Sequence, residues 1–281
     1  MTAGGAPAPG RLFVVSTPIG NMADFSFRAV ETLRAVSAVL AEDTRHTRQL
    51  VDHYGIATPL AAYHEHNEAK MTPRVVARLR AGEDVALVSD AGTPLISDPG
   101  ARLVRAAIEA GITVVPVPGA SALLAALVAS GIDAEPFTFF GFMPRGGSGR
   151  AEVLVAVAQS PWTGILYEAP GRVVDTLTAV AERAGPHRKA VVARELTKRF
   201  EELRRGTLAE LAAYYSETPP RGEVVIVVTG APERTVDEKQ LRARARELRA
   251  QGYTRRDVAT ELTREFEAPR NLAYRVAKEA E

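Results

Sequence analysis

Short apolar runs alternate with amphipathic stretches through the first half of the chain. Apolar runs bounded by turn residues are typical of buried strands, and apolar residues at helical spacing are typical of helices that pack on a sheet. We therefore predict an N-terminal α/β domain over residues 11–136 with a mainly parallel sheet. The expected strands cover 11–17, 38–43, 84–90 and 112–117, and the expected helices cover 26–36, 44–54, 99–110 and 121–131.

The same alternation continues in the second half and predicts a second α/β domain over residues 137–231. Four glycines and one proline in "GFMPRGGSGR" make residues 141–150 the best candidate for a linker. The expected strands cover 162–169, 189–196, 200–207 and 222–230, and the expected helices cover 172–185 and 208–217.

The two ends of the chain follow other patterns. Residues 1–10 combine glycine, proline and alanine and predict a flexible tail. Residues 237–281 predict three short helices separated by Gly252 and Pro269. Their helix, glycine turn, helix pattern is typical of a helix-turn-helix-like nucleic-acid module, although a packing role at a dimer or domain surface fits equally well.

Composition narrows the function classes. The chain has 281 residues, a formal net charge of +1 and no cysteine. The near-zero charge excludes a strongly basic coat for nucleic acid, and the absence of cysteine excludes disulfides, thiol nucleophiles and thiolate metal sites. No apolar run approaches the ~20 residues that a membrane helix needs, so we expect a cytoplasmic protein with no membrane partner.

Four loops directly behind predicted strands are rich in glycine, proline and hydroxyl side chains. In open α/β sheets ligands bind beyond the carboxyl ends of strands, so these loops predict a ligand site, although tight turns alone would also use such residues. Neither the P-loop nor the GxGxxG spacing is present, which argues against nucleoside triphosphate and nicotinamide cofactors. The loops are "STPIGN" (16–21), "SDAGTPLISDPG" (89–100), "PVPGASA" (116–122) and "YEAPGR" (167–172).

Several longer motifs carry a specific resemblance. The runs "AEDTRHTRQLV", "YHEHNE", "LVSDAGTPLISDPG", "VPVPGASALLAAL", "FFGFMPR" and "LYEAPGRV" resemble the ribosomal RNA small-subunit methyltransferase I family of the tetrapyrrole-methylase superfamily. The resemblance implies two α/β domains with a cofactor cleft between them and S-adenosylmethionine as co-substrate, with no metal. It also implies a homodimer that methylates the 2′-oxygen of a cytidine in the decoding region of 16S ribosomal RNA, within the small ribosomal subunit.

Carried over residue by residue, the resemblance implies ten cofactor contacts, to which Asp90 is added as a candidate. The chain departs from the superfamily where a Gly-Asp-Pro is common, because it has Gly92-Thr93-Pro94 there. An aspartate contact therefore does not transfer directly, and Asp90 is the candidate to replace it. The expected cofactor contacts are Pro18, Asp90, Ala91, Gly92, Thr93, Ile96, Ser121, Ala122, Tyr167, Glu168 and Leu196.

Methyl transfer to a ribose hydroxyl benefits from a base that accepts its proton. The acid pair of "EDTR", Glu42 and Asp43, is the favoured source because Arg45 would place a phosphate-binding cation beside it. His66 in "YHEHNE" is a further candidate. A metal site at the two histidines of that motif lacks further clear ligands. The expected RNA-binding cations are Arg45, Arg48, Arg145, Lys198 and Arg199.

Two other functions stay open at this point. One is methylation of a different acceptor, either a tetrapyrrole such as a corrin precursor or a modified histidine on a translation factor. The other is a non-catalytic RNA-binding factor that retains the cofactor pocket as a scaffold. Glycine and alanine at Gly92, Gly119 and Ala122 keep the pocket open, which favours a working enzyme over a vestigial site.

Overall fold

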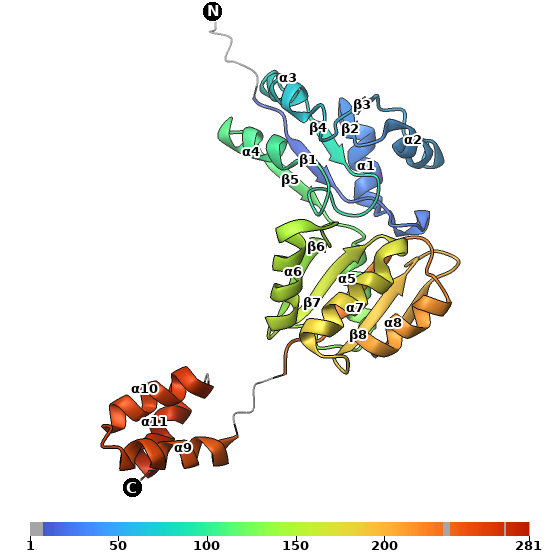
Figure 1. Cartoon of the computed structure of the whole chain (residues 1–281). Helices are drawn as coiled ribbons and strands as arrows, with labels where there is room; N and C mark the ends of the chain where they lie inside the picture. Colours follow the sequence, from blue (N-terminus) through green and yellow to red (C-terminus); the bar gives the residue numbers. More distant parts are fainter. Residues whose placement is uncertain (1–7, 233–236, 267, 281) are drawn as a thin grey trace, which may run out of the picture. The chain divides into compact units, whose positions relative to one another are not determined.

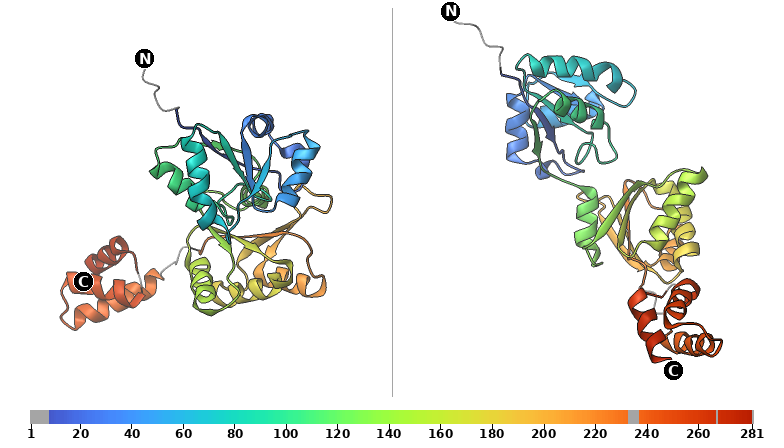
Figure 2. Two further views of the ribbon diagram at one scale, coloured as in Figure 1. Left: turned by 90° about the horizontal axis from the view of Figure 1, so that it is seen from above. Right: turned by 90° about the vertical axis from the view of Figure 1, so that its left-hand side faces the viewer.

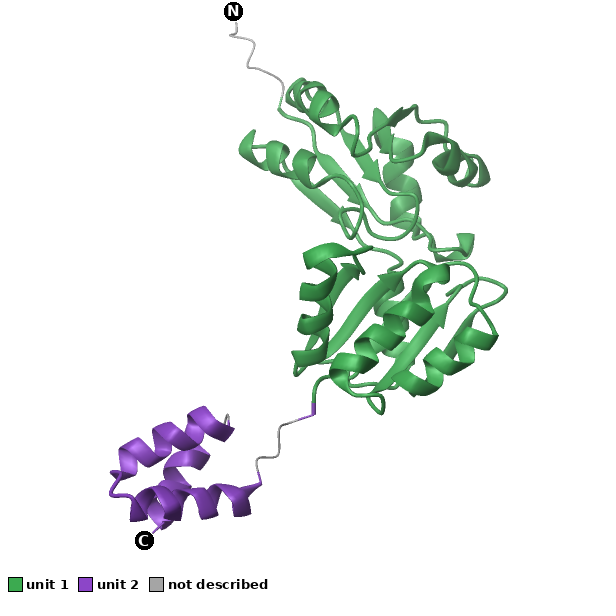
Figure 3. Cartoon of the chain, viewed as in Figure 1, with its two compact units in different colours: residues 1–231 green, residues 232–281 purple. Residues whose placement is uncertain are grey.

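The computed structural model describes residues 8–232, 237–266 and 268–280. The chain divides into two compact units, residues 1–231 and 232–281 (Figure 3). Unit 1 holds two five-stranded sheets with their helices, as Figure 1 shows. Among the helices of the described residues, none is long and apolar enough to cross a membrane.

The first sheet is parallel throughout and has the order β3-β2-β4-β1-β5. Its strands alternate their side chains between two helical layers: Ala86 and Val88 of β4 face α1 and α2, whereas Val85 and Leu87 face α3 and α4. The elements are β1 (Leu12–Val15), η1 (Met22–Asp24), α1 (Phe27–Ala35), β2 (Ala38–Ala41), α2 (Thr44–His53), β3 (Leu60–Ala62), α3 (Glu68–Arg80), β4 (Val85–Val88), α4 (Ala101–Glu109) and β5 (Val114–Val117).

The second sheet is mixed and has the order β6-β7-β10-β8-β9. Only β6 and β7 run parallel, and the other pairs are antiparallel. The elements are α5 (Ala122–Ser130), β6 (Phe137–Phe142), α6 (Gly147–Gln159), β7 (Thr163–Glu168), η2 (Pro170–Arg172), α7 (Val173–Ala184), β8 (Lys189–Arg194), β9 (Glu202–Thr207), α8 (Leu208–Glu217) and β10 (Val224–Val228).

Helix α5 lies before the expected boundary at residue 136, yet it packs on the second sheet. Its Leu123 and Leu127 share a core with Ile165 of β7 and Val225 of β10. Helices α6, α7 and α8 cover the opposite face, and the right-hand view of Figure 2 shows α5 separated from them by the sheet. The helix is apolar on all sides, although only one face meets this sheet: Leu123 and Leu127 are buried, whereas Leu124 and Val128 are exposed.

The expected linker over residues 141–150 is wrong. Residues up to Phe142 complete β6, and α6 begins at Gly147, so both ends of the segment belong to the second sheet and its helical layer. The glycines and the proline suggested a linker, but in the structure they lie at the end of β6 and the start of α6. Sequence periodicity also missed β3, α3, β6 and α6.

The expected flexible tail lies mostly outside the described residues, because the structure describes the chain from residue 8. Gly10 is fixed rather than flexible. Its N–H donates to the carbonyl of Leu79 at 2.7 Å, and an added Cβ would meet the Glu83 carbonyl oxygen.

Unit 2 consists of three helices with a core of their own. The helices are α9 (Glu238–Ala250), α10 (Arg255–Phe266) and α11 (Arg270–Glu279), as the apolar spacing predicts. Leu241, Leu248, Val258, Leu262 and Val276 are fully or nearly fully buried together. This unit therefore has the packing of an independent small module.

Candidate functional site

Two strand-end loops of the first sheet are joined backbone to backbone. The N–H of Thr17 donates to the Gly92 carbonyl at 2.8 Å, and the N–H of Gly92 donates to the Thr17 carbonyl at 3.1 Å. These loops follow β1 and β4, the neighbours from which the chain crosses to opposite sides of the sheet. Such a switch point opens a crevice at the carboxyl ends of the strands.

The loop after β5 closes onto the same junction. Thr93 Oγ1 donates to the Ala120 carbonyl at 3.3 Å and shares a hydrogen bond of 3.0 Å with Ser16 Oγ. Gly119 is required here, because an added Cβ would lie 3.0 Å from the Ser16 Cβ. The threonine that replaces the aspartate of a Gly-Asp-Pro therefore ties three loops together.

The backbone of residues 92–97 is tightly coiled. Gly92 has φ +77°, which glycine adopts freely, but Leu95 (φ +73°) and Ser97 (φ +68°) adopt the same left-handed region. That conformation is unfavourable for residues with a Cβ, so the surrounding contacts must hold it. Such backbone strain clusters at functional sites.

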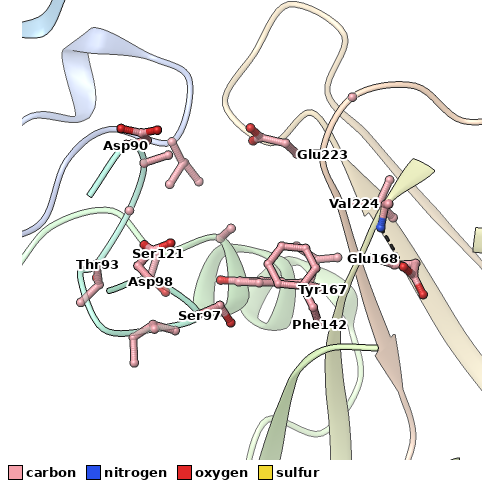
Figure 4. Close-up of a pocket in the computed structure, with 18 of the residues that line it drawn as sticks. Asp90, Thr93, Ser97, Asp98, Ser121, Phe142, Tyr167, Glu168, Glu223 and Val224 are labelled. Atoms are coloured by element: carbon pink, nitrogen blue, oxygen red, sulfur yellow. Dashed lines mark hydrogen bonds between the residues drawn. The ribbon is translucent and has the colours of Figure 1, made fainter. Parts of the chain in front are cut away.

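These loops and the second sheet enclose a cavity of about 380 Å³ within unit 1. Figure 4 shows Asp90, Thr93, Asp98 and Ser121 on one side, with Tyr167, Phe142 and Glu223 on the other. The volume suits a small organic ligand. The lining residues are Ile19, Glu42, Asp90, Ala91, Gly92, Thr93, Ile96, Ser97, Asp98, Ser121, Ala122, Phe142, Tyr167, Glu168, Ala169, Pro170, Gly222, Glu223, Val224 and Val225.

Most of the expected cofactor contacts line this cavity. Pro18 and Leu196 do not; their neighbour Ile19 lines it instead, and Leu196 is buried in the core beneath α5. Glu168 contributes through its backbone, because its carboxylate is fully buried elsewhere and accepts from Thr176 Oγ1 at 2.6 Å. The expected residues that line the cavity are Asp90, Ala91, Gly92, Thr93, Ile96, Ser121, Ala122, Tyr167 and Glu168.

Charge in the cavity is one-sided. Glu42, Asp90, Asp98 and Glu223 line it, and no lysine, arginine or histidine does so among the described residues. The implied methyl donor carries a sulfonium and an ammonium group, so an acidic and partly apolar lining fits it. The same described residues contain no group of three or more acidic, histidine or cysteine side chains placed to hold a metal ion.

Two neighbouring carboxylates of "EDTR" have opposite surroundings. Burial, followed by the charges of Asp98, Asp90 and Glu65, raises the pKa of Glu42 to about 7. Hydrogen bonds from Arg45 hold the pKa of Asp43 far below its usual range, and Asp43 also caps α2 through the Arg45 N–H. Glu42 is therefore suited to accept a proton near neutral pH, whereas Asp43 is a poor base.

A further carboxylate was not singled out from the sequence. Burial, with a contribution from the charge of Asp90, raises the pKa of Asp98 to about 6. Asp90 in turn accepts from the N–H of Asp43 at 3.0 Å, which joins the ends of β2 and β4. The signal for Asp98 was its place in "ISDPG", where it reads as an ordinary turn residue.

The other predicted catalytic and RNA-binding residues lie outside the cavity lining. His66 is exposed and lies 3.3 Å from Glu65, and Arg45 is exposed and paired with Asp43. Lys198 is not a free cation, because its Nζ lies 3.1 Å from Glu195 and 3.0 Å from Glu223. The remaining RNA-binding candidates, which are also exposed, are Arg48, Arg145 and Arg199.

Lys198 instead supports the site. Its stem packs so closely on Gly20 that an added Cβ there would lie 2.4 Å away, while its ammonium group holds Glu223 at the cavity wall. The side chain thus links the loop after β1 to the second sheet. Glu223 was missed because a carboxylate directly before a strand gives no signal of its own.

The family model of tetrapyrrole (corrin/porphyrin) methylases matches residues 11–212. The ribosomal RNA small subunit methyltransferase I of Synechocystis is 47% identical over 275 residues, which cover 97% of this chain and 99% of that protein. The protein of the same name from Pseudomonas aeruginosa is 54% identical over 228 residues, 80% of this chain and 81% of that protein.

Solved structures share the fold at low identity. Uroporphyrin-III C-methyltransferase from Thermus thermophilus, in complex with S-adenosyl homocysteine, superposes with a TM-score of 0.58 and 19% identity. That match covers 78% of this chain and 97% of that one. A diphthine synthase gives a TM-score of 0.60 at 15% identity, over 78% of this chain and 90% of that one.

Gly92 offers a test of the cavity. Gly92→Ala should raise the Kd of S-adenosylmethionine roughly tenfold, about 1.4 kcal/mol, because a residue with a Cβ would strain the loop at φ +77° directly at the cavity. Gly111→Ala is the matched control: its φ of +71° carries the same strain of about 1–2 kcal/mol, but its Cβ would meet open space outside the cavity. Calorimetric titration of both variants with S-adenosylmethionine measures the two Kd values. Equal values would show that the loop at Gly92 does not contact the ligand.

Proposed function

Because this chain belongs to the ribosomal RNA small subunit methyltransferase I family of the tetrapyrrole methylases, we propose that it transfers a methyl group from S-adenosylmethionine to ribosomal RNA. The acceptor in this proposal is the 2′-hydroxyl of a cytidine in the decoding region of 16S ribosomal RNA. The observation that carries it is the acidic cavity at the joined strand ends.

S-adenosylmethionine, when bound, supplies a methyl carbon on a positively charged sulfur that an oxygen attacks in line. The backbone bends at Gly92 and Ser121 would fix the donor, and the carboxylates of the lining would favour its positive charge. Holding donor and acceptor in line supplies much of the acceleration, since the donor is already activated.

We assign the general base to Glu42. It follows β2 directly, lines the cavity and has a pKa near neutrality. As the 2′-oxygen bonds to the methyl carbon and the carbon–sulfur bond breaks, the hydroxyl proton passes to the Glu42 carboxylate. Burial, followed by the charges of Asp98 and Asp90, raises the pKa of that carboxylate and makes it basic enough to take the proton.

The proposal includes a homodimer that acts on the small ribosomal subunit in the cytoplasm. Helix α5 supports a second copy, because Leu124 and Val128 are exposed one helical turn apart. The cytoplasm is proposed because the acceptor, ribosomal RNA, is located there.

The decisive test offers tritiated S-adenosylmethionine with small ribosomal subunits that lack the modification, and in parallel with a corrin precursor. Label should enter 16S ribosomal RNA, and nuclease digestion should release a 2′-O-methylcytidine. Label in the tetrapyrrole alone would favour the rival acceptor. Failure to bind S-adenosylmethionine at all would point to the non-catalytic RNA-binding factor.

The assignment of Glu42 predicts a pH dependence. Only the deprotonated carboxylate accepts a proton, so the single-turnover rate should rise with pH through about 7 and level off above it. Glu42→Gln should lower the plateau on the order of 10²–10⁴-fold and remove that limb.

The adjacent Asp43→Asn is the control, because asparagine preserves the cap of α2 and Asp43 does not line the cavity. It should keep both the rate and the rise near pH 7. An unchanged profile in Glu42→Gln would remove the assignment.

We also propose that unit 2 binds RNA through α11. Ala273 and Val276 face the core of the unit, while Arg270, Tyr274 and Lys278 are exposed in a row at i, i+4 spacing. Cations contact phosphates and an exposed aromatic ring can stack on a base, so this face has the chemistry of an RNA contact.

The double variant Arg270→Glu/Lys278→Glu should weaken binding to small ribosomal subunits about tenfold at low salt and leave the Kd of S-adenosylmethionine unchanged. Lys239→Glu, an exposed position on α9, serves as control. Filter binding across a salt series measures the effect, and equal behaviour of both variants would assign unit 2 a role other than binding RNA.

A further inference from the structure

Strand β6 ends in an irregularity that turns one aromatic ring toward the cavity. Its register with β7 shifts between Phe139 and Phe142, and Gly141 between them has φ +69°. Such bulges re-aim a side chain and are common beside active sites. As a result Phe142 lines the cavity, yet 58% of it is exposed.

The ring has firm support beneath it. It packs edge-on against Tyr167 with centroids 5.3 Å apart, and Tyr167 packs in the same way against Phe139 at 4.8 Å (Figure 4 shows Phe142 beside Tyr167). The Met143 N–H donates to the Tyr167 carbonyl at 3.2 Å. Arg172 donates to the carbonyls of Met143 and Pro144 at 2.7 and 2.9 Å, which fixes the chain after the ring.

Phe142 is held rigid at the cavity wall, so its exposed ring offers a flat apolar surface to a ligand in the cavity. Ile96, on the facing loop, is also partly exposed at the cavity, so the rim has an apolar side. Arg145 follows three residues after Phe142 and is exposed, with no ion pair among the described residues. An aromatic ring followed by an unpaired cation suits a single nucleotide, whose base stacks and whose phosphate binds the guanidinium.

We propose that Phe142 is a positioning residue that stacks on the base of the nucleotide to be methylated and so sets its ribose over the donor. The inference rests on the proposed function, because it assumes an RNA acceptor. Phe142 lies on the wall of the cavity across from Asp90 and Thr93 of the joined loops (Figure 4), and in this proposal the acceptor approaches along that wall. Stacking works for any base, so Phe142 gives position and affinity rather than base identity.

The test measures methylation of small ribosomal subunits at saturating S-adenosylmethionine. Phe142→Ala should raise the KM for subunits about 10- to 100-fold, the range that loss of one stacked base gives. Phe142→Tyr and Phe142→Trp should restore it, whereas Phe142→Leu, apolar but without a ring, should not. Phe27→Ala is the matched control, because Phe27 is 91% exposed and does not line the cavity.

Three results would overturn the inference: an unchanged KM in Phe142→Ala, full rescue by leucine, or a raised Kd of S-adenosylmethionine that places the ring against the donor. A change in sedimentation of Phe142→Ala would instead assign the ring to a subunit contact and would also overturn it. Failure of the proposed function is distinguishable, since the unaltered protein would then methylate no subunits.

Discussion

The reciprocal pair of hydrogen bonds between Thr17 and Gly92 is the constraint on which the site depends. It joins the carboxyl ends of two adjacent parallel strands just where their connections diverge, so neither loop can fold over the crevice. Residue 92 must adopt a positive φ beside Ile19 to make these hydrogen bonds. Glycine does so with little backbone strain because it has no Cβ. Thr93 then ties the loop after β5 to the same point. The cavity lies beside this junction, and Gly92 and Thr93 of the junction line it.

Glu42 and Asp43 are adjacent in "EDTR", but the fold gives them different roles. Asp43 faces the start of α2 and Arg45, where N–H groups and a guanidinium favour its charge. Glu42 faces the cavity, where burial and three further carboxylates disfavour its charge. The separation follows from the end of β2, which sends alternate side chains to opposite sides. One residue therefore stabilises a helix while its neighbour is held ready to accept a proton.

Sequence reasoning located four of the five strands of the first sheet, all but β3, and the loops behind β1, β4, β5 and β7, because alternating apolar runs and turn residues are local signals. It missed what depends on distant contacts. The roles of Asp98 and Glu223 depend on partners that only the tertiary structure brings near them. These partners are Asp90 for Asp98 and Lys198 for Glu223. Lys198 resembled a free RNA-binding cation because nothing in its own segment reveals that Glu223 holds it. The glycines of 141–150 suggested a linker, whereas Gly141 serves the bulge of β6.

The two sheets contribute differently, and this difference bears on how related enzymes can modify unlike acceptors. Structures as different in substrate as a uroporphyrin methyltransferase and a diphthine synthase share this fold at 15–19% identity. The first sheet supplies bends made of backbone, which tolerate sequence change as long as glycine and small residues remain at a few points. The wall from the second sheet is made of side chains, among them Phe142 and Tyr167. Because fold alone does not fix function, the side chains of that wall can differ between proteins of this fold without disturbing the junction at Gly92.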